Sequence, residues 1–432
     1  MEKQVKELPL IWLLIGNLVE STGMSFIWPL TTIYMHDYLG KSLTVAGVVL
    51  FIGSMAMIAG NYTGGYLYDH KDARHYLLLA LTLSLFATGF LVFESGWPYY
   101  PLMIILNNFA IGVSGTIVNS LATTIKRYDS RYVFNLMYFM ANVGVVLGTL
   151  GVGFVINISV RLIFIINFVM FAVFFVIASL FYKVPKNDKH HLKQAKQGGM
   201  KTRRYAVYII TAVLIAYFVI QLGYAQWQSN LSVYMEKLGI SLSKYSLLWT
   251  INGVIIVCLQ PIISWIDEHY NVDIFKKVYL GIGLFVVAYS SLIVAHAYWM
   301  FIMSMVIVTV GEVCLFPAIP TVVDKLSSAS EKGKYQGQIG IAASLGHAIG
   351  PLFGGVVIEH YSYGILFTLM ALGVFMSEGW LILCRRLKAK IGDWDESKNW
   401  RVNYQNGHVG GQNHDRKWGW HGPGRRYFKK NR

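Results

Sequence analysis

Long apolar segments recur along the chain as far as Arg386, separated by short polar breaks. A helix needs about 20 mostly apolar residues to cross the hydrocarbon core of a membrane, and these segments have that length. Hydrophobic residues make up 55% of the 432 residues and charged residues only 14%, which is too apolar for a soluble domain of this size. The pattern therefore predicts an all-α integral membrane protein with twelve transmembrane helices.

The expected helices form two sets of six. The first set is expected at Leu10 to Met35, Val45 to Tyr68, Tyr76 to Phe93, Tyr100 to Thr124, Phe134 to Ile156 and Leu162 to Tyr182. The second set is expected at Tyr205 to Met235, Tyr245 to Ile266, Val278 to Ala295, Trp299 to Val323, Gln336 to Ile358 and Ile365 to Cys384. The first segment is too long for a signal-peptide core and no small-residue cleavage site follows it, so we interpret it as a membrane helix.

Lysine and arginine are distributed unevenly between the two sides of this arrangement. Short loops on the cytoplasmic side of membrane proteins carry an excess of these residues. The loops on the same side as both termini carry Lys71, Arg74, Lys126, Arg127, Arg131, Lys276, Lys277, Lys325, Lys332 and Lys334. The other loops carry only Lys41, Arg161, Lys237 and Lys244. We therefore expect both termini to be cytoplasmic in a multi-pass protein of a bacterial cell membrane, and attribute the net charge of +15 to this topology rather than to nucleic-acid binding.

A long basic break divides the helices six and six. The expected domains are a six-helix bundle at 1–182, a cytoplasmic linker at 183–204, a second bundle at 205–386 and a tail at 387–432. The tail is rich in glycine and charge and should be disordered. The basic residues of the linker and the tail could contact anionic lipid headgroups.

The two halves repeat each other. Residues 34–43 at the end of the first helix recur at 234–242, and Asp69 after the second helix has a counterpart in Asp267 after the eighth. Glycines of the fifth helix match glycines of the eleventh at the same spacing, and every matched pair is about 200 residues apart. Two such repeats are the architecture of a transporter whose halves rock about a central site.

The loop after the second helix reads GGYLYDHKDARH and resembles the signature loop of the major facilitator superfamily through Gly65, Asp69 and Arg74. It departs from that signature at His70, where a permanent cation is usual, at Asp72, where glycine is usual, and at His75. The resemblance implies that Gly65 allows close helix contact, while Asp69 and Arg74 make charge-assisted contacts across the cytoplasmic interface between the halves.

A glycine-rich segment in the eleventh helix, GHAIGPLFGG, resembles the glycine motif of drug:proton antiporters, although that motif belongs to the fifth helix. The fifth helix has Thr149 where the motif has proline. Small residues at this spacing let helices approach closely. The candidate packing residues are Gly144, Gly148, Gly153, Gly346, Gly350, Pro351, Gly354 and Gly355.

Two acidic residues lie near the middle of membrane helices: Glu20 in the first and Glu312 in the tenth. An acid in the membrane is costly and so indicates a function. By resemblance to the family, these helices line the central cavity from opposite halves. Burial favours the protonated form of a carboxyl group, so either acid could load and release a proton. We expect one to carry the proton and the other to face the substrate, with the assignment open.

Polar and aromatic residues of the fourth and seventh helices would complete the cavity. The candidates are Asn107, Asn108, Asn119, Gln221, Tyr224 and Trp227. Asn108 stands where many family members have an arginine, so coupling through that arginine is not expected. An aromatic cavity with a few acids suits lipophilic cations.

These features together predict a proton-coupled carrier that exports amphipathic, cationic compounds by alternating access. The proton gradient would supply the energy; no cofactor, metal, P-loop or catalytic constellation is expected, and the chain should be a monomeric transporter rather than an enzyme. One alternative is a carrier of a specific metabolite such as a peptide, amino acid or sugar. Another is a receptor on a transporter scaffold, which would bind solute without moving it.

Overall fold

The computed structural model describes residues 8–27, 31, 34–41, 43–155, 159–182, 202–270 and 272–390. Contacts within the chain group residues Met1–Arg385 into one compact unit, to which all of the statements below refer. Nearly all of the predicted linker and of the predicted tail lies outside the described residues. The division of the helical region into two bundles stays a prediction.

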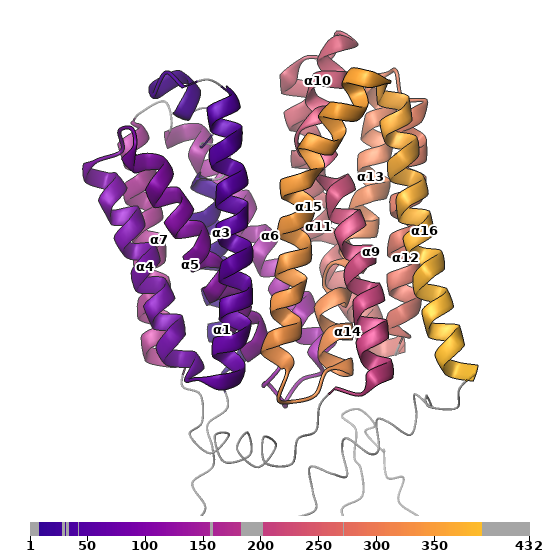
Figure 1. Ribbon diagram of the computed structural model, residues 1–432, viewed down its shortest axis with the longest axis horizontal. Coiled ribbons are helices and arrows are strands. Elements are labelled where there is room, and N and C mark those ends of the chain that lie inside the picture. Colours follow the sequence, from indigo (N-terminus) through magenta and orange to yellow (C-terminus); the bar gives the residue numbers. More distant parts are fainter. Residues whose placement is uncertain are drawn as a thin grey trace, which may run out of the picture. The chain divides into compact units, whose positions relative to one another are not determined.

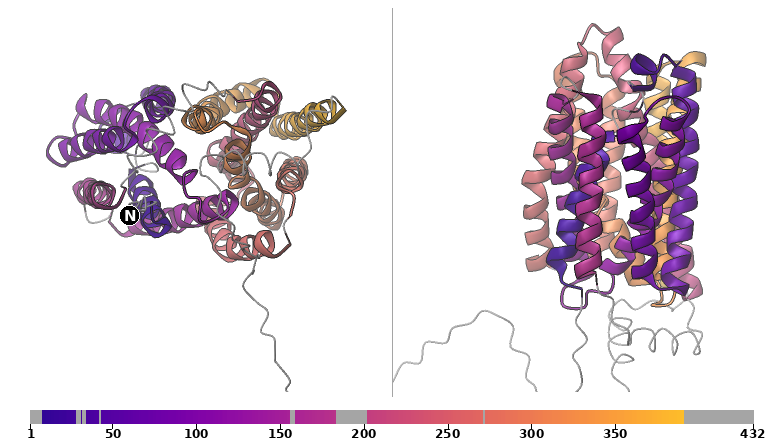
Figure 2. Two further views of the ribbon diagram at one scale, coloured as in Figure 1. Left: turned by 90° about the horizontal axis from the view of Figure 1, so that it is seen from below. Right: turned by 90° about the vertical axis from the view of Figure 1, so that its left-hand side faces the viewer.

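Every regular element among the described residues is a helix. The first half contains α1 (Leu10–Ile27), the short π-helix η1 (Tyr34–Tyr38), α3 (Leu43–His70), α4 (Ala73–Phe93), α5 (Tyr99–Ala122), α6 (Ser130–Val155) and α7 (Val160–Phe181). The second half contains α9 (Arg204–Gln228), α10 (Asn230–Lys237), α11 (Leu242–Tyr270), α12 (Ile274–Ile293), α13 (Tyr298–Leu315), α14 (Ala318–Leu326), α15 (Lys332–His360) and α16 (Tyr363–Lys390). The helices run side by side along a common direction (Figures 1 and 2).

The number of membrane-spanning helices agrees with the sequence. Among the described residues, eleven helical segments are long and apolar enough to cross a membrane, α13 and α14 together forming one of them. The helix α6, 26 residues long at the place of the fifth predicted span, brings the number to twelve. Helices are suited to lipid because they satisfy their own backbone hydrogen bonds. The predicted fold class, an all-α membrane protein with twelve helices, is confirmed.

Two of the predicted spans are interrupted. The seventh span breaks at Ser229 between α9 and α10, where the Ser229 hydroxyl donates a hydrogen bond to the Ala225 carbonyl. The tenth breaks at Phe316 and Pro317 between α13 and α14, because proline has no N–H to continue the helix. Periodicity alone predicted both as continuous.

The helix α7 ends and the helix α9 begins at the same end of the molecule, at the bottom of Figure 1. We call this end the linker end, because the predicted linker joins these two helices.

The two halves meet along two pairs of helices. The helix α15 lies between α3 of the first half and α9 of its own half (Figure 1), and α6 packs against both α1 and α11. At one close approach a Cβ on Gly65 of α3 would lie 2.6 Å from the carbonyl oxygen of Gly333, and a Cβ on Gly333 would lie 2.6 Å from that of Gly65. Only glycine at both positions allows these backbones to touch.

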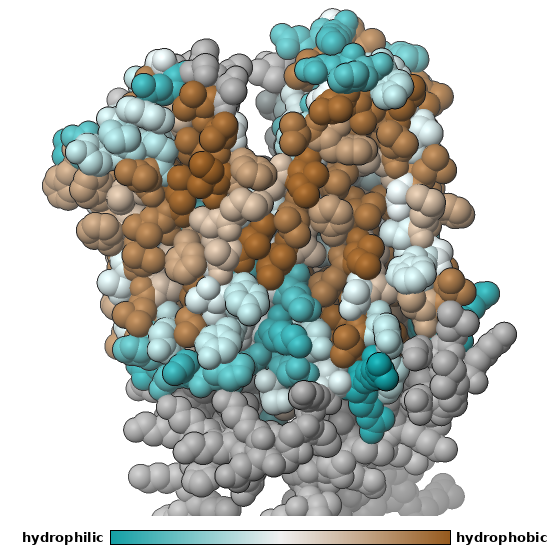
Figure 3. Space-filling model, viewed as in Figure 1, coloured by the Kyte–Doolittle hydropathy of each residue, from teal (hydrophilic) through white to brown (hydrophobic). Residues whose placement is uncertain are grey.

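Apolar side chains cover the middle of the visible face and polar ones its two ends (Figure 3). Exposed apolar residues such as Leu352, Phe375 and Met376 lie on α15 and α16. This band matches the hydrocarbon layer that surrounds a membrane protein.

Candidate functional site

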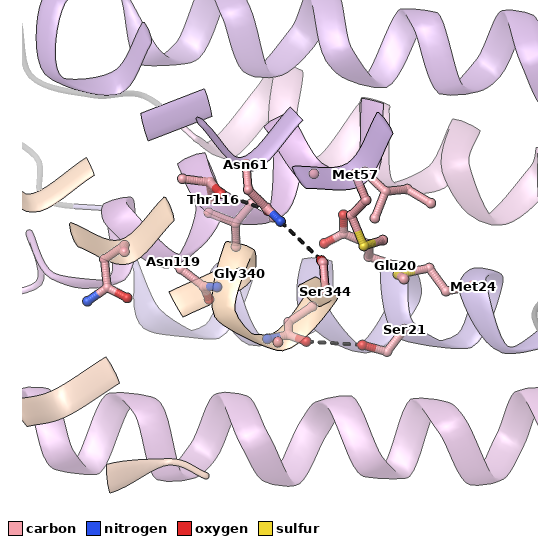
Figure 4. A pocket seen from close by; sticks show the side chains of 16 residues that line it. Glu20, Ser21, Met24, Met57, Asn61, Thr116, Asn119, Gly340 and Ser344 are labelled. Atoms are coloured by element: carbon pink, nitrogen blue, oxygen red, sulfur yellow. Dashed lines mark hydrogen bonds between the residues drawn. The ribbon is translucent and has the colours of Figure 1, made fainter. Parts of the chain in front are cut away.

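A cavity of about 350 Å³ lies among α1, α3, α5 and α15. The first helix contributes Asn17, Glu20 and Ser21, and the methionines Met24 and Met57 add apolar, polarisable surface (Figure 4). Three of these four helices belong to the first half and α15 belongs to the second. The cavity is therefore built at the interface between the halves and would change shape if they moved.

Glu20 lies on the wall of this cavity. Its side chain is 8% exposed, and one carboxylate oxygen accepts a hydrogen bond from the hydroxyl of Ser114 on α5, at 2.9 Å. The hydroxyl of the next residue, Ser21, donates to the side chain of Asn17, one turn earlier, at 3.2 Å. A carboxylate can accept about four hydrogen bonds, so Glu20 keeps acceptor capacity for a group in the cavity.

A polar contact between the halves closes one side of the cavity. The amide of Asn61 on α3 donates to the Ser344 hydroxyl on α15 at 3.4 Å and accepts from the Thr116 hydroxyl of α5 at 3.1 Å (Figure 4). Gly340 makes room for this amide, because a Cβ there would lie 2.6 Å from it.

Glu312 lies on α13, outside the lining of that cavity, and is 4% exposed. Its carboxylate accepts hydrogen bonds from Tyr138 of α6 at 2.8 Å, from Asn252 of α11 at 2.9 Å and from Tyr224 of α9 at 3.3 Å. Asn252 also donates to Thr309, one turn before Glu312 on the same helix, at 2.9 Å. Tyr138 is the donor from the first half, so the bond that it makes joins the two halves at Glu312.

Aromatic rings surround this carboxylate. The ring of Phe316, at the break after α13, lies 6.2 Å from that of Tyr138, 5.9 Å from that of Tyr217 and 5.6 Å from that of Tyr224 between centroids. The imidazole of His347 on α15 lies edge-to-face with Tyr224 at 6.5 Å. Such a shell keeps water from the carboxyl group and offers ring faces to a cation.

The predicted lining residues fall in three environments. Asn119 lines the cavity with Glu20, and Tyr224 binds Glu312. In contrast, the Asn108 amide packs against Gly53 of α3, and Gln221 packs against Gly346 of α15. Asn107 and Trp227 are buried, outside the lining of this cavity. The structure thus brings Asn119 to Glu20 and Tyr224 to Glu312, and a cavity role for the other four stays a prediction.

The signature loop makes one of its two predicted contacts. The Asp69 carboxylate accepts hydrogen bonds from the backbone N–H groups of Gly333, at 2.9 Å, and Lys334, at 2.8 Å, in the first turn of α15. A negative charge is favourable there because the N–H groups of a helix start are unpaired. Arg74 does not cross the interface: it lies in the first turn of α4, which packs on α7, and it donates to the Ser179 carbonyl of α7 in the same half.

Asp267, the counterpart of Asp69 in the second half, joins α11 to α6, the second pair of helices at which the halves meet. Asp267 on α11 accepts from the Asn135 amide of α6 at 2.9 Å and forms an ion pair with Lys277 of α12 at 2.7 Å. Nearby, the guanidinium of Arg131 donates to the Val272 carbonyl at 2.6 Å. An aspartate therefore holds each pair of helices together at the linker end. Asp69 accepts from backbone N–H groups, and Asp267 accepts from side chains.

The glycine motifs pack in the same way in both halves. A Cβ on Gly144 or Gly148 of α6 would lie 2.6 Å from a backbone oxygen of α1, and one on Gly346 or Gly350 of α15 would lie within 2.9 Å of the Leu222 backbone of α9. Among the other candidates, Gly354 faces Gln226, Pro351 is exposed and Gly355 has open space around it. Gly153 lies outside the residues whose surroundings are described.

Several residues at these sites were missed from the sequence: Tyr138, Asn252, His347, Asn61 and Ser344. Asn61 and Asn252 are amides within apolar helices and could have been singled out on that ground, since polar groups in membranes need partners. Tyrosine and serine are common in membrane helices and gave no comparable signal.

Twelve membrane helices, a cavity between two halves and aspartate contacts at one end are the features of a membrane transporter. The sequence matches the Major Facilitator Superfamily over residues 13–274 and 215–401, and the chain belongs to this family of transporters. It is 35% identical over 380 residues to an uncharacterized MFS-type transporter, YttB, of Bacillus subtilis (strain 168), covering 87% of this chain and 95% of that protein.

Two more distant relatives carry functional names. A Na(+), Li(+), K(+)/H(+) antiporter of Planococcus maritimus is 24% identical over 84% of this chain and 92% of its own. The multidrug resistance protein MdtH of Salmonella newport (strain SL254) is 22% identical over 82% of this chain and 88% of its own. Among solved structures, a bacterial homologue of the iron transporter ferroportin superposes with a TM-score of 0.70 at 11% identity, covering 87% of this chain and 99% of that one. This last likeness concerns the fold alone.

Proposed function

We propose that this transporter exports amphipathic organic cations in exchange for protons. The observation that carries the proposal is the contrast between two buried carboxyl groups. Glu20 faces a cavity and, within the described part of the chain, accepts one hydrogen bond, from Ser114, whereas Glu312 accepts hydrogen bonds from both halves. The names of two relatives, a multidrug resistance protein and a cation/proton antiporter, agree with this class of transport.

Glu312 is the proton carrier in this proposal. As a carboxylate it accepts from Tyr138, which lies in the other half. A proton on Glu312 converts one acceptor oxygen into a donor, and the hydroxyl of Tyr138 then loses a charge-assisted bond. Protonation would thus weaken a link between the halves, which is how a proton could bias the exchange between conformations.

Glu20 is the substrate-facing acid. Its cavity combines one carboxyl group with amides, hydroxyls and two methionines, and so offers both charge and a deformable apolar wall to an organic cation. The volume of about 350 Å³ suits a compact ligand.

The linker end is the cytoplasmic end in this proposal, because the short loops rich in lysine and arginine lie there. Asp69 and Asp267 hold the halves together at that end, so the conformation is the one closed to the cytoplasm. The membrane would be the cell membrane.

A second candidate is alkali-cation/proton antiport, favoured by the printed name of the Planococcus relative and by the oxygens of Asn17, Glu20 and Ser21 on one cavity wall. The two candidates differ in the size of the cation that they would transport. An organic cation fills the cavity, whereas Na⁺ needs only a cage of oxygens.

Inverted membrane vesicles with an imposed proton gradient test the proposal. Addition of ethidium should release protons, read as dequenching of a pH-sensitive dye, in the wild type and in Glu378→Gln, whose acid lies on the outer helix α16. Glu312→Gln should abolish the release. If NaCl and KCl release protons and ethidium does not, the alkali-cation candidate replaces the first. If none of them does, both fail.

A further inference from the structure

A second cavity, of about 250 Å³, lies where α6 meets α11 at the interface between the halves. Its walls include Tyr132, Leu136 and Phe139 of α6 and Gln260, Trp265 and Glu268 of α11. None of these residues contributes to the central cavity or to the shell of Glu312 described above. They come from the first turns of α6 and the last turns of α11, and so lie toward the linker end.

The side chain of Gln260 is the unusual group in this cavity. It is 1% exposed, and neither its Oε1 nor its Nε2 has a hydrogen-bond partner in the part of the chain that the structure describes. The next residue, Pro261, lies within the helix and has no N–H for the carbonyl of Val257, one turn earlier. Buried amide groups are normally paired, since leaving one unpaired costs stability. An amide that borders a cavity and lacks partners is poised to bind something there.

The mouth of the cavity combines aromatic and acidic groups. The indole of Trp265 is 52% exposed and lies 4.5 Å from the ring of His269 between centroids. Glu268 is exposed beside it. Tryptophan is enriched where membrane meets water, and a ring with a neighbouring carboxylate attracts an organic cation.

We propose that this cavity is an access site, at which amphipathic cations from the cytoplasmic leaflet bind before they reach the central cavity. The apolar part of the ligand packs on Leu136, Phe139 and Trp265, and its charge is drawn to Glu268. An N–H group on the ligand donates to Oε1 of Gln260. The access site therefore prefers cations that carry amino groups. This inference rests on the proposed function and adds a second site and a substrate preference to it.

Two cationic probes distinguish a hydrogen bond to the Gln260 amide from apolar and charge contacts in the access site. Ethidium carries amino groups, whereas tetraphenylphosphonium is a lipophilic cation without any hydrogen-bond donor. The variant Gln260→Met keeps the length and removes both polar atoms. The KM for ethidium should rise about fivefold, because one hydrogen bond is lost. The KM for tetraphenylphosphonium should not change. The purified variant should also melt at a higher temperature, since an unpaired polar group has been removed.

The aromatic contact has a matched control. Trp265→Leu should raise the KM for both probes, whereas Trp380→Leu, on α16 with 51% of its side chain exposed, should leave both unchanged. Photolysis of ethidium monoazide on the wild type should label peptides of α6 and α11 that contain residues 132–139 and 260–268. Excess ethidium should suppress this label.

The outcomes distinguish the access site from the proposed function. An unchanged KM for ethidium in Gln260→Met, a lower melting temperature of that variant, or photolabel confined to the central cavity would each overturn the access site while export stood. If the wild type moves neither probe against protons, the proposed function fails, and the access site with it.

Discussion

The hydroxyl of Tyr138 on α6 donates a hydrogen bond of 2.8 Å to the carboxylate of Glu312 on α13, and so ties the first half of the transporter to an acid of the second. The other donors to this carboxylate, Asn252 and Tyr224, come from the half that contains Glu312 itself. Movement of the halves would break the bond to Tyr138 and leave the other two in place. The state of charge of Glu312 and the contact between the halves are therefore linked through one hydroxyl group.

Tyr138→Phe removes that hydroxyl and nothing else. We expect proton release on addition of ethidium to slow about tenfold, because a hydrogen bond to a charged group is lost. Binding of ethidium to the purified protein should not change. The matched control is Tyr62→Phe on α3, whose side chain is exposed and lines neither of the two cavities. Equal rates in wild type and Tyr138→Phe would show that this bond takes no part in coupling.

Asp69→Ala should make the first turn of α15 open more often. The backbone N–H groups of Gly333 and Lys334 would lose the acceptor that now holds them. Their hydrogen exchange, followed by mass spectrometry, should accelerate about tenfold. Arg74→Gln is the control, because Arg74 bonds to α7 and not across the interface. If Arg74→Gln accelerates exchange at these amides as much as Asp69→Ala does, the assignment of the interface contact to Asp69 alone is incorrect.

Gly144→Val should separate α6 from α1. The added Cβ would lie 2.6 Å from the Leu18 carbonyl oxygen and 3.0 Å from the Thr22 nitrogen, both of them backbone atoms that cannot turn away. Overpacking of this kind costs about 1–3 kcal/mol, so the melting temperature in detergent should fall by several degrees. Gly355→Ala, at a position with nothing within 4 Å of the added carbon, should not lower it. A stable Gly144→Val variant would contradict the close packing of α1 and α6.

Acid should weaken the anchor at the start of the second half. Glu331 accepts a hydrogen bond from the backbone of Thr202 at 2.8 Å and one from Lys334 at 3.2 Å. Burial would raise the pKa of Glu331, but the hydrogen bonds from Thr202 and Lys334 outweigh burial and hold the pKa below its ordinary value.

A group whose pKa is lowered by folding stabilises the folded state above its unfolded pKa, about 4 for glutamate, and loses that contribution as the pH falls through the folded pKa. Glu331→Gln should therefore melt at a lower temperature than the wild type at pH 7, with the difference shrinking as the pH falls below about 4 and vanishing below the lowered pKa of the folded state. A difference that persists in acid would mean that the charge of Glu331 is not the source of the stabilisation.

The sequence predicted the number of helices, because length and hydropathy decide what crosses a membrane. It also singled out Asp69, which contacts the start of α15 in the structure, because the loop carries a recognisable signature. The breaks at Ser229 and Pro317 were missed, because the apolar pattern continues through both; the structure shows each as the end of one helix and the start of the next.

The candidate site was predicted less completely. Glu20 and Glu312 stood out as acids in apolar helices, but their different surroundings depend on the rotation of each helix about its axis, which a 20-residue apolar segment does not encode. The same applies to Asn119, which lines the cavity, and to Asn108, eleven positions earlier on the same helix, which packs against α3. The contact of Arg74 was assigned to the wrong partner because the neighbour of α4 is a property of the packing.

The division of labour between the two acids is the central claim, and one comparison tests it most directly. Binding of ethidium to purified protein and proton release from inverted vesicles would be measured for Glu20→Gln and for Glu312→Gln. We predict that Glu20→Gln loses binding of the cation, while Glu312→Gln binds it as the wild type does and releases no protons. Normal proton release by Glu312→Gln, or equal loss of binding in both variants, would contradict the account.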